Sequence, residues 1–399
     1  MSMTTEQVIA DGQKYVMNTY GRLPMVIDRG EGCYVWDLDG NRYLDLVAGI
    51  AVNSLGHCHP AVTKAIQEQS EKLMHCSNLY WIENQVALAK LLVEKSGLGK
   101  AFFCNSGAEA NEAAIKLARK WGKGEKYHII TMQKSFHGRT MGSLAATAQE
   151  KYQKAFRPLP EGFSAVPLGD LDALEKEIRP ETCAVMLEPI QGESGINVPS
   201  QEYMQGVQAL CKKYGILLIA DEVQTGLGRT GKCFGFQNFG IEPDIISLAK
   251  AIGNGVPMGA IVAKTEVADC FQPGDHASTF GGTPIATAVG IAACSILLDD
   301  AFLAQVRETG EYFRAQLGAI AERHAGLIKE VRGLGLMIGC ELTGSSKAAA
   351  AELLKQGVLV NSIGDHVLRF VPPLIISKAE IDGFMPVLEQ VLVQTAEAQ

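Results

Sequence analysis

Three short segments of the chain carry residue types that can do chemistry together. In Asn105-Ser-Gly-Ala-Glu-Ala-Asn111, small residues stand where a helix begins, and backbone N–H groups at such a point attract anions such as phosphate. Asp221-Glu-Val-Gln224 puts a carboxylate directly after an apolar segment. Lys250 also follows an apolar segment, and a lysine among apolar neighbours has a lowered pKa and can attack an aldehyde. Taken singly, each has a simpler explanation: a capped helix, a solvent-facing acid and a surface lysine.

Together the three segments meet the needs of one cofactor, pyridoxal phosphate. This cofactor requires an anion site for its phosphate, a carboxylate for its pyridinium nitrogen and a lysine for its aldehyde. An opposite charge at close range shifts a pKa by ~1–3 units, or roughly 1.4–4 kcal/mol, which keeps the ring nitrogen protonated at neutral pH. We therefore predict a pyridoxal-phosphate enzyme in which Lys250 holds the cofactor and Asp221 pairs with its ring.

The elements that must position these residues alternate along the middle of the chain. Apolar, β-branched segments that predict strands alternate with amphipathic segments that predict helices, and this alternation is typical of an α/β fold with a mostly parallel sheet. The expected strands are residues 100–104, 126–131, 182–187, 216–221, 245–248 and 260–263, and the expected helices include 108–121 and 200–214. The three chemical segments all follow expected strands, where α/β proteins bind their ligands.

The two ends of the chain have a different texture and predict a second, smaller domain. Thr283-Pro284 can start a helix that continues to Leu298, and a helix is expected from Lys378. Short strand signals lie at residues 32–38 and 42–46, and further α+β signals lie at 330–342 and 358–370. We expect a large cofactor-binding domain at residues 61–285 and a discontinuous small α+β domain made of residues 1–60 and 286–399.

Composition excludes several classes of partner. The chain has 399 residues, 47% of them hydrophobic, and a formal net charge of −8, so it offers no basic surface for nucleic acid or an anionic membrane. Its longest apolar stretches fall short of the ~20 residues that span a bilayer. The polar N-terminus does not resemble a signal peptide, and the 10 cysteines form no C-x-x-C pair. We expect a soluble, cytoplasmic protein with reduced thiols.

Two glycine-rich patterns and one histidine pair offer rival interpretations. Gly226-Leu-Gly-Arg-Thr-Gly231 matches the fingerprint of a nicotinamide-dependent dehydrogenase, but no helical periodicity follows it. The same window nearly forms a nucleotide-triphosphate loop but ends in Cys233, where Ser or Thr is required. His57-Cys-His59 precedes a proline without further ligands nearby, so we expect no metal site. A glycine-rich active-site loop explains the first two patterns better.

Over nearly its whole length the chain resembles the class III (ω-type) aminotransferases of pyridoxal-phosphate fold type I. The resemblance runs from residues 32–45 to residues 368–373 and is most specific between residues 218 and 253. It implies that Lys250 binds the cofactor and shuttles a proton, and that Phe136 and Val223 pack on the two faces of the ring. The cofactor-binding residues it implies are Ser106, Gly107, Ala108, Phe136, Asp221, Glu222, Val223, Gln224, Lys250 and Thr279. Because Thr279 would serve a neighbouring subunit, the resemblance also implies a homodimer with shared active sites.

The motifs Phe136-His-Gly-Arg-Thr140, Asn78-Leu-Tyr80 and Glu188-Pro-Ile-Gln-Gly192 are most similar to family members that act on N-acetylornithine. The expected reaction moves the δ-amino group of N-acetyl-L-ornithine to 2-oxoglutarate, within arginine metabolism. Succinylornithine, ornithine and 4-aminobutyrate remain alternative donors. The resemblance implies that the substrate-binding residues are Arg139, Ser278, Arg369 and Tyr20.

Two of these arginines would bind substrate carboxylates, and one acid would control them. Arg139 and Arg369 can each bind a carboxylate through two hydrogen bonds. The resemblance implies that Glu193 acts catalytically as a switch, pairing with Arg369 in the first half-reaction and moving aside in the second.

Overall fold

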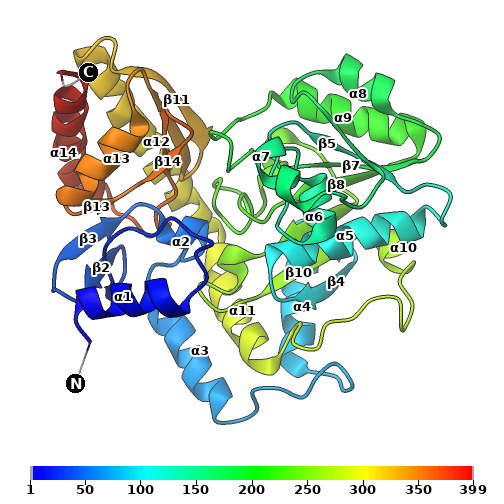
Figure 1. The fold of residues 1–399 in the computed structure, drawn as a ribbon. Coiled ribbons are helices and arrows are strands. Elements are labelled where there is room, and N and C mark those ends of the chain that lie inside the picture. Colours follow the sequence, from blue (N-terminus) through cyan, green and yellow to red (C-terminus); the bar gives the residue numbers. More distant parts are fainter. Residues whose placement is uncertain (1–2, 398–399) are drawn as a thin grey trace.

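The largest sheet of the computed structural model, which describes residues 3–397, has seven strands and lies on the right in Figure 1. Its strand order is β4-β10-β9-β8-β7-β5-β6. The strands are β4 (Lys100–Cys104), β5 (His128–Met132), β6 (Phe163–Val166), β7 (Thr182–Leu187), β8 (Leu217–Asp221), β9 (Ile245–Leu248) and β10 (Gly259–Ala263). Only β10 runs antiparallel to its neighbours, so the prediction of a mostly parallel sheet is confirmed. The sequence did not predict β6, a short strand at the sheet edge.

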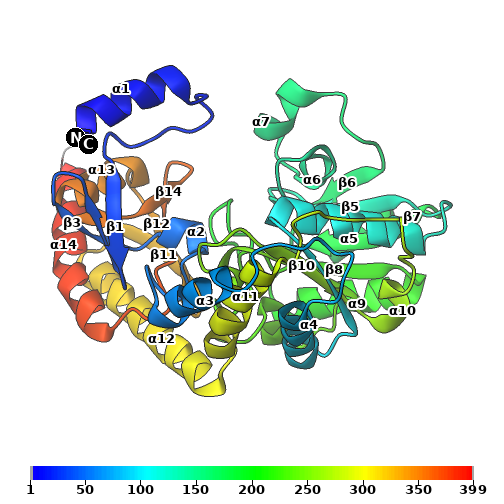
Figure 2. The same ribbon diagram turned by 90° about the horizontal axis from the view of Figure 1, so that it is seen from below.

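Helices cover both faces of this sheet, because successive side chains of a strand point to opposite faces. On β8, Leu217 and Ile219 pack into one core cluster with α5, whereas Leu218 and Ala220 pack into a second cluster with α4 and α9. Figure 2 shows α5 on one side of the sheet and α4 and α9 on the other. The helices of this part are α4 (Glu83–Ser96), α5 (Gly107–Trp121), α6 (Met141–Ala146), α7 (Glu150–Gln153), α8 (Leu171–Glu177), α9 (Gln201–Tyr214) and α10 (Thr265–Ala268), with the 3-10 turns η1 (Lys154–Phe156), η2 (Gly235–Phe239) and η3 (Lys250–Ile252).

Two four-stranded sheets form a second group of elements from both ends of the chain. Their orders are β1-β2-β3-β13 and β11-β12-β15-β14. The strands are β1 (Ile27–Glu31), β2 (Tyr34–Asp37), β3 (Arg42–Asp45), β11 (Ile328–Leu334), β12 (Met337–Leu342), β13 (Val358–Leu359), β14 (Asn361–Ile363) and β15 (Val367–Phe370). Strand β13 pairs in parallel with β3, with Val358 opposite Leu44. Strands from residues 27–45 therefore share a sheet with a strand from the last quarter of the chain. The expected domain boundaries at residues 60 and 285 stay a prediction.

The remaining helices surround these two sheets or connect them to the seven-stranded sheet. They are α1 (Thr5–Tyr15), α2 (Ala48–Ala51), α3 (Pro60–Ser70), α11 (Pro284–Leu297), α12 (Asp300–Arg323), α13 (Ser346–Lys355) and α14 (Lys378–Glu397). Among residues 3–397 no single helix is long and apolar enough to cross a membrane, and the pair α11 and α12, bent by 64°, meets that test by length and composition only. Much of α11 is buried, and it packs against α3 and α4.

The short element α2 is a left-handed turn. The φ angles of Ala48, Gly49, Ile50 and Ala51 are 50°, 63°, 64° and 60°. Left-handed backbone costs an L-residue about 1–2 kcal/mol, and a β-branched residue such as Ile50 adopts it rarely. The surrounding structure must therefore hold this turn in place.

The rival motifs of the sequence have structural roles in this fold. No α-helix begins within or directly after the glycine loop at residues 226–231, so the dinucleotide interpretation loses its required element. Arg229 of this loop is fully buried and donates hydrogen bonds to the carbonyl oxygens of Leu336 and Pro372. His57 pairs with Asp45, and the side chain of His59 caps α3. Within the described residues no group of three or more His, Cys, Asp or Glu side chains could hold a metal ion.

Candidate active site

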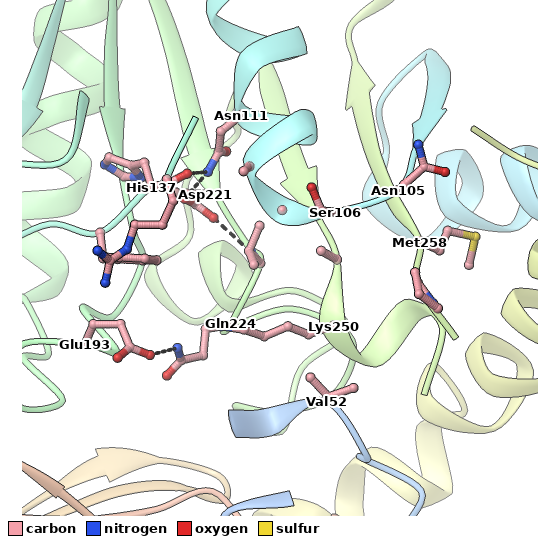
Figure 3. A pocket seen from close by; sticks show the side chains of 18 of the residues that line it. Val52, Asn105, Ser106, Asn111, His137, Glu193, Asp221, Gln224, Lys250 and Met258 are labelled. Carbon is pink, nitrogen blue, oxygen red and sulfur yellow. Dashed lines mark hydrogen bonds and ion pairs between the residues drawn. The ribbon is translucent and has the colours of Figure 1, made fainter. Parts of the chain in front are cut away.

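A cavity of about 400 Å³ opens where five strands of the large sheet end (Figure 3). The carboxyl ends of β4, β5, β7, β8 and β9 lead into Ser106, Phe136, Glu188, Asp221 and Lys250, all of which line it. Such a crevice is where ligands bind in open α/β sheets. The predicted site residues that line it are Ser106, Gly107, Ala108, Phe136, Arg139, Glu193, Asp221, Val223, Gln224 and Lys250.

The start of α5 forms one wall of the cavity. Ser106 is the N-cap, and its hydroxyl accepts a hydrogen bond from the backbone N–H of Glu109. The next amides, of Gly107 and Ala108, have no acceptor within the helix and carry the positive end of its dipole. A Cβ atom at Gly107 would lie 2.8 Å from Cγ1 of Val223, so only glycine fits there. This wall has the properties of a phosphate site.

Asp221 is held in place by three donors (Figure 3). Its Oδ2 atom lies 2.7 Å from Nδ1 of His137 and 2.8 Å from Nδ2 of Asn111, and its Oδ1 accepts from the backbone N–H of Val223 at 3.0 Å. Burial alone would lower the pKa of His137, but the hydrogen bond and charge of Asp221 outweigh burial and raise it. The pair presents a fixed carboxylate, the group that a protonated ring nitrogen requires.

Lys250 stands at the centre of the site, directly after β9. Its φ angle is +51°, which turns the chain sharply into η3. Within residues 3–397 its ammonium group makes no hydrogen bond or ion pair. Burial lowers the pKa of Lys250, although the charge of Glu193 opposes this shift. A half-buried lysine with a lowered pKa and no partner in the described chain is suited to nucleophilic attack.

Glu188 connects two loops of the cavity. Its Oε1 accepts a hydrogen bond from the backbone N–H of Phe136 at 2.9 Å, and its Oε2 accepts from that of Gly192 at 3.1 Å. Burial raises the pKa of Glu188 to about 7. The ring of Phe136 packs edge-on against Tyr152, with centroids 5.8 Å apart. Glu188 therefore ties the loop of Phe136 to the loop that carries Glu193.

Arg369 and Glu193 form an ion pair at the edge of the cavity. Nη1 of Arg369, whose side chain is fully buried, lies 2.7 Å from Oε1 of Glu193. Gln224 joins them: its Nε2 donates to the same Oε1 at 2.9 Å, and its Oε1 accepts from Arg369 at 3.3 Å. Burial alone would raise the pKa of Glu193, but the charges of Arg369 and Lys250, together with the hydrogen bonds from Arg369 and Gln224, outweigh burial and lower it. The pairing that the resemblance implied is present.

Arg139 differs from Arg369 in having a free guanidinium group. It is exposed at the cavity, and its guanidinium carbon lies 4.0 Å from the centroid of the Tyr152 ring. No carboxylate among residues 3–397 forms an ion pair with Arg139. One arginine that lines the cavity is therefore available to a carboxylate, and a second, which lies beside the cavity behind Glu193, is occupied by that internal acid.

Besides Arg369, four predicted residues do not line the cavity. Glu222 is a correction: its carboxylate is buried on the other side of the strand end, where it accepts from Thr225, Gly235 and Phe236, and it does not line the cavity. Tyr20 is 69% exposed and lies outside the cavity in this chain, so its expected part in substrate binding stays a prediction. Ser278 and Thr279 line a separate surface cavity, although the Ser278 hydroxyl accepts a hydrogen bond from Asn105 of the main site at 3.1 Å.

The residues of the site that were not assigned from the sequence include Asn111, His137 and Glu188. Each had a usable signal. Asn111 lies one helical turn after Gly107, on the same face of α5. Glu188 follows the apolar strand β7 as Asp221 ends β8. His137 adjoins Phe136, and the side chain of a buried histidine requires a hydrogen-bond partner.

The fold and this site are those of an aminotransferase. The family model for class-III aminotransferases matches residues 15–392, and the chain belongs to that family. It is 54% identical to an acetylornithine aminotransferase of Caldanaerobacter subterraneus subsp. tengcongensis, over 95% of this chain and 98% of that protein. It is 49% identical to an acetylornithine aminotransferase of Methanocaldococcus jannaschii, over 98% of this chain and 99% of that protein. Among solved structures, ornithine aminotransferase from Toxoplasma gondii superposes with a TM-score of 0.95 at 33% identity, covering 100% of this chain and 97% of the other.

Proposed function

We propose that this enzyme uses pyridoxal phosphate to move the δ-amino group of N-acetyl-L-ornithine to 2-oxoglutarate. The products are N-acetyl-L-glutamate 5-semialdehyde and L-glutamate, which places the reaction in arginine metabolism. The observation that carries the proposal is that Lys250, Asp221 and the start of α5 line one cavity, beside the Glu193–Arg369 pair. The high identity to relatives named acetylornithine aminotransferase supports the choice of donor.

The residues present fit pyridoxal phosphate. The amides of Gly107 and Ala108 would hold its phosphate, Asp221 its ring nitrogen, and Lys250 its aldehyde carbon. Phe136 and Val223 would enclose the ring, and Gln224 would lie near its phenolic oxygen. When bound, the cofactor supplies an electron sink that lets the carbon–hydrogen bond beside the substrate amine ionise. Burial lowers the pKa of Lys250. Its amine is therefore more often unprotonated at neutral pH than that of an exposed lysine, and an unprotonated amine can accept that proton.

The two arginines account for two substrates in one site. The α-carboxylate of acetylornithine binds Arg139, while Glu193 neutralises Arg369, so the terminal amine faces Lys250. Glutamate must present its α-amine instead. Its α-carboxylate then binds Arg369, its side-chain carboxylate binds Arg139, and Glu193 moves aside.

Free ornithine is a second candidate donor, because the solved ornithine aminotransferase has nearly the same fold over the whole chain. Succinylornithine and 4-aminobutyrate are further alternatives. Donors that differ by one acyl group are separated by pocket contacts worth ~1–3 kcal/mol. Steady-state kcat/KM for all four donors with 2-oxoglutarate tests the assignment: acetylornithine should lead by at least about tenfold. A higher kcat/KM for unacylated ornithine would overturn the proposal and identify ornithine as the donor.

We also propose a cytoplasmic homodimer, in which a second copy covers an exposed apolar surface. Leu79, Tyr80 and Trp81 are 81%, 69% and 93% exposed, and they line the surface cavity that contains Ser278 and Thr279. Apolar side chains gathered in this way are typical of a protein–protein interface. Thr279 would then contribute to the partner's cofactor site.

A further inference from the structure

Asp45, the last residue of β3, binds the backbone of the turn that follows it. Its Oδ1 accepts hydrogen bonds from the backbone N–H groups of Val47 at 2.9 Å and Ala48 at 2.8 Å. Its Oδ2 lies 2.7 Å from Nε2 of His57. The Asp45 side chain is almost fully buried, so these partners replace the water that a carboxylate otherwise needs.

The turn held by Asp45 is the left-handed turn α2. Three of its four residues, Ala48, Ile50 and Ala51, are not glycine and have φ near +60°. An isolated peptide of this sequence would not adopt that backbone, so the conformation depends on its anchors. Asp45 supplies the anchor at the start of the turn, and His57 extends that anchor to the segment beyond it.

The turn contacts the loops that carry the substrate-binding groups. Ala51 packs in a small apolar cluster with Ile190, Ile196 and Val371. Ile190 and Ile196 flank Glu193, and Val371 follows Arg369 by two residues. The backbone N–H of Val371 also donates to the carbonyl oxygen of Leu46 at 3.0 Å.

The other end of the same segment is fixed to the lysine loop. Val52, directly after the turn, lines the cavity with Lys250 (Figure 3). The backbone N–H of Leu55 donates to Oδ1 of Asn254 at 2.8 Å, four residues after Lys250. Residues 45–57 therefore bridge the Glu193–Arg369 pair and the loop of Lys250.

We propose that Asp45 is a positioning residue, which holds the left-handed turn so that Val52 and the Glu193–Arg369 pair stay in register with Lys250. The inference rests on the proposed function in one respect, the identity of the substrate whose binding is affected. Because the turn packs on Val371 and on the two isoleucines that flank Glu193, loss of Asp45 misplaces the pair whose arginine binds the α-carboxylate of glutamate.

The test compares Asp45→Ala with three other variants of the holoenzyme. Asp45→Asn keeps an oxygen that can accept from Val47 and Ala48. Asp45→Ala/Ala48→Gly replaces one strained residue by glycine, which adopts positive φ freely. Asp37→Ala is the matched control: Asp37 lies in the same sheet, is equally buried, and accepts from the backbone N–H of Asn41 at 2.8 Å and the Tyr43 hydroxyl at 2.8 Å, but does not line the cavity.

Two readouts are required, hydrogen–deuterium exchange of peptides covering residues 46–56 and KM for each substrate. Asp45→Ala should exchange faster there and raise KM for glutamate about tenfold, with less than about a twofold change for acetylornithine. Asp45→Asn should resemble the wild type, and the double variant should recover at least half of the effect. The inference is overturned if Asp37→Ala produces the same KM pattern, or if Asp45→Ala leaves exchange unchanged. Wild-type protein that transfers no amine would refute the proposed function, whereas the exchange data would still decide the role of Asp45.

Discussion

Arg369 and Glu193 are 176 residues apart in the chain, yet Nη1 of the first lies 2.7 Å from Oε1 of the second. Strand β15 delivers the arginine by pairing with β12, and the loop after β7 delivers the acid. The arginine is fully buried and the acid is 25% exposed on its side chain. The acid is thus the partner that can move, and the arginine is the fixed one.

The first prediction concerns this pair. Glu193→Ala removes the acid that pairs with Arg369, so the α-carboxylate of glutamate no longer competes with Glu193 for this arginine. The single-turnover rate with glutamate should rise about tenfold or more relative to that with acetylornithine, a change of roughly 1.4 kcal/mol in relative barrier. Glu341→Ala, which breaks the ion pair with Arg332 at 2.6 Å, should leave the ratio unchanged. Equal effects of Glu193→Ala on both substrates would refute the switch.

Arg139 should contribute binding energy to both substrates. Hydrogen bonds to charged groups are worth about 1.5–3 kcal/mol, so Arg139→Ala should raise KM for acetylornithine and 2-oxoglutarate by ~10–150-fold. Arg157→Ala removes a nearby surface arginine that pairs with Glu150 and should leave both values within about twofold. A KM change for one substrate alone would show that Arg139 does not serve both half-reactions.

Glu188 should make stability depend on pH. Its pKa is about 7 when folded against a model value of 4.5, so between these values the folded chain holds a proton that the unfolded chain releases. Stability therefore falls as pH rises through this window, and above pH 7 the ionised carboxylate destabilises the fold by about 3 kcal/mol. The Tm of the wild type relative to Glu188→Gln should decrease from pH 4.5 to pH 7.5. A pH-independent difference would contradict this account.

The apolar surface around Trp81 should be a subunit interface. Trp81→Arg places a charge in the middle of it, so sedimentation should show monomers and amine transfer should fall together. Tyr127→Arg changes a 45%-exposed aromatic residue directly before β5 and should leave the oligomer intact. A Trp81→Arg protein that sediments as the wild type does would remove this surface from the proposed interface.

Residues close to a strand end could be predicted from the sequence, because a β–α connection places them within one turn of a known element. Asp221, Lys250 and the start of α5 are of this kind, and the structure brings them into one cavity. Glu222 was assigned wrongly because it adjoins Asp221, while neighbouring residues of an extended chain point to opposite sides. Strand β6 was missed because four residues of mixed burial at a sheet edge have little pattern.

Features that depend on long-range packing could not be predicted. The left-handed backbone of Ala48 to Ala51 is set by Asp45 and His57, and no local propensity indicates it. Glu188 is held by two amides from different loops, which become neighbours only in the folded chain. For Thr279, the proposed contact requires a second chain.

The most direct test of the central claim is a single-turnover spectrum of the purified enzyme loaded with pyridoxal phosphate. The protein is mixed separately with acetylornithine, succinylornithine, ornithine and 4-aminobutyrate, and Lys250→Ala protein is measured alongside. The account predicts that the visible band of the bound cofactor disappears fastest with acetylornithine, and that the variant shows no such turnover. A wild-type protein without a cofactor band after loading, or one whose band responds fastest to unacylated ornithine, would contradict it.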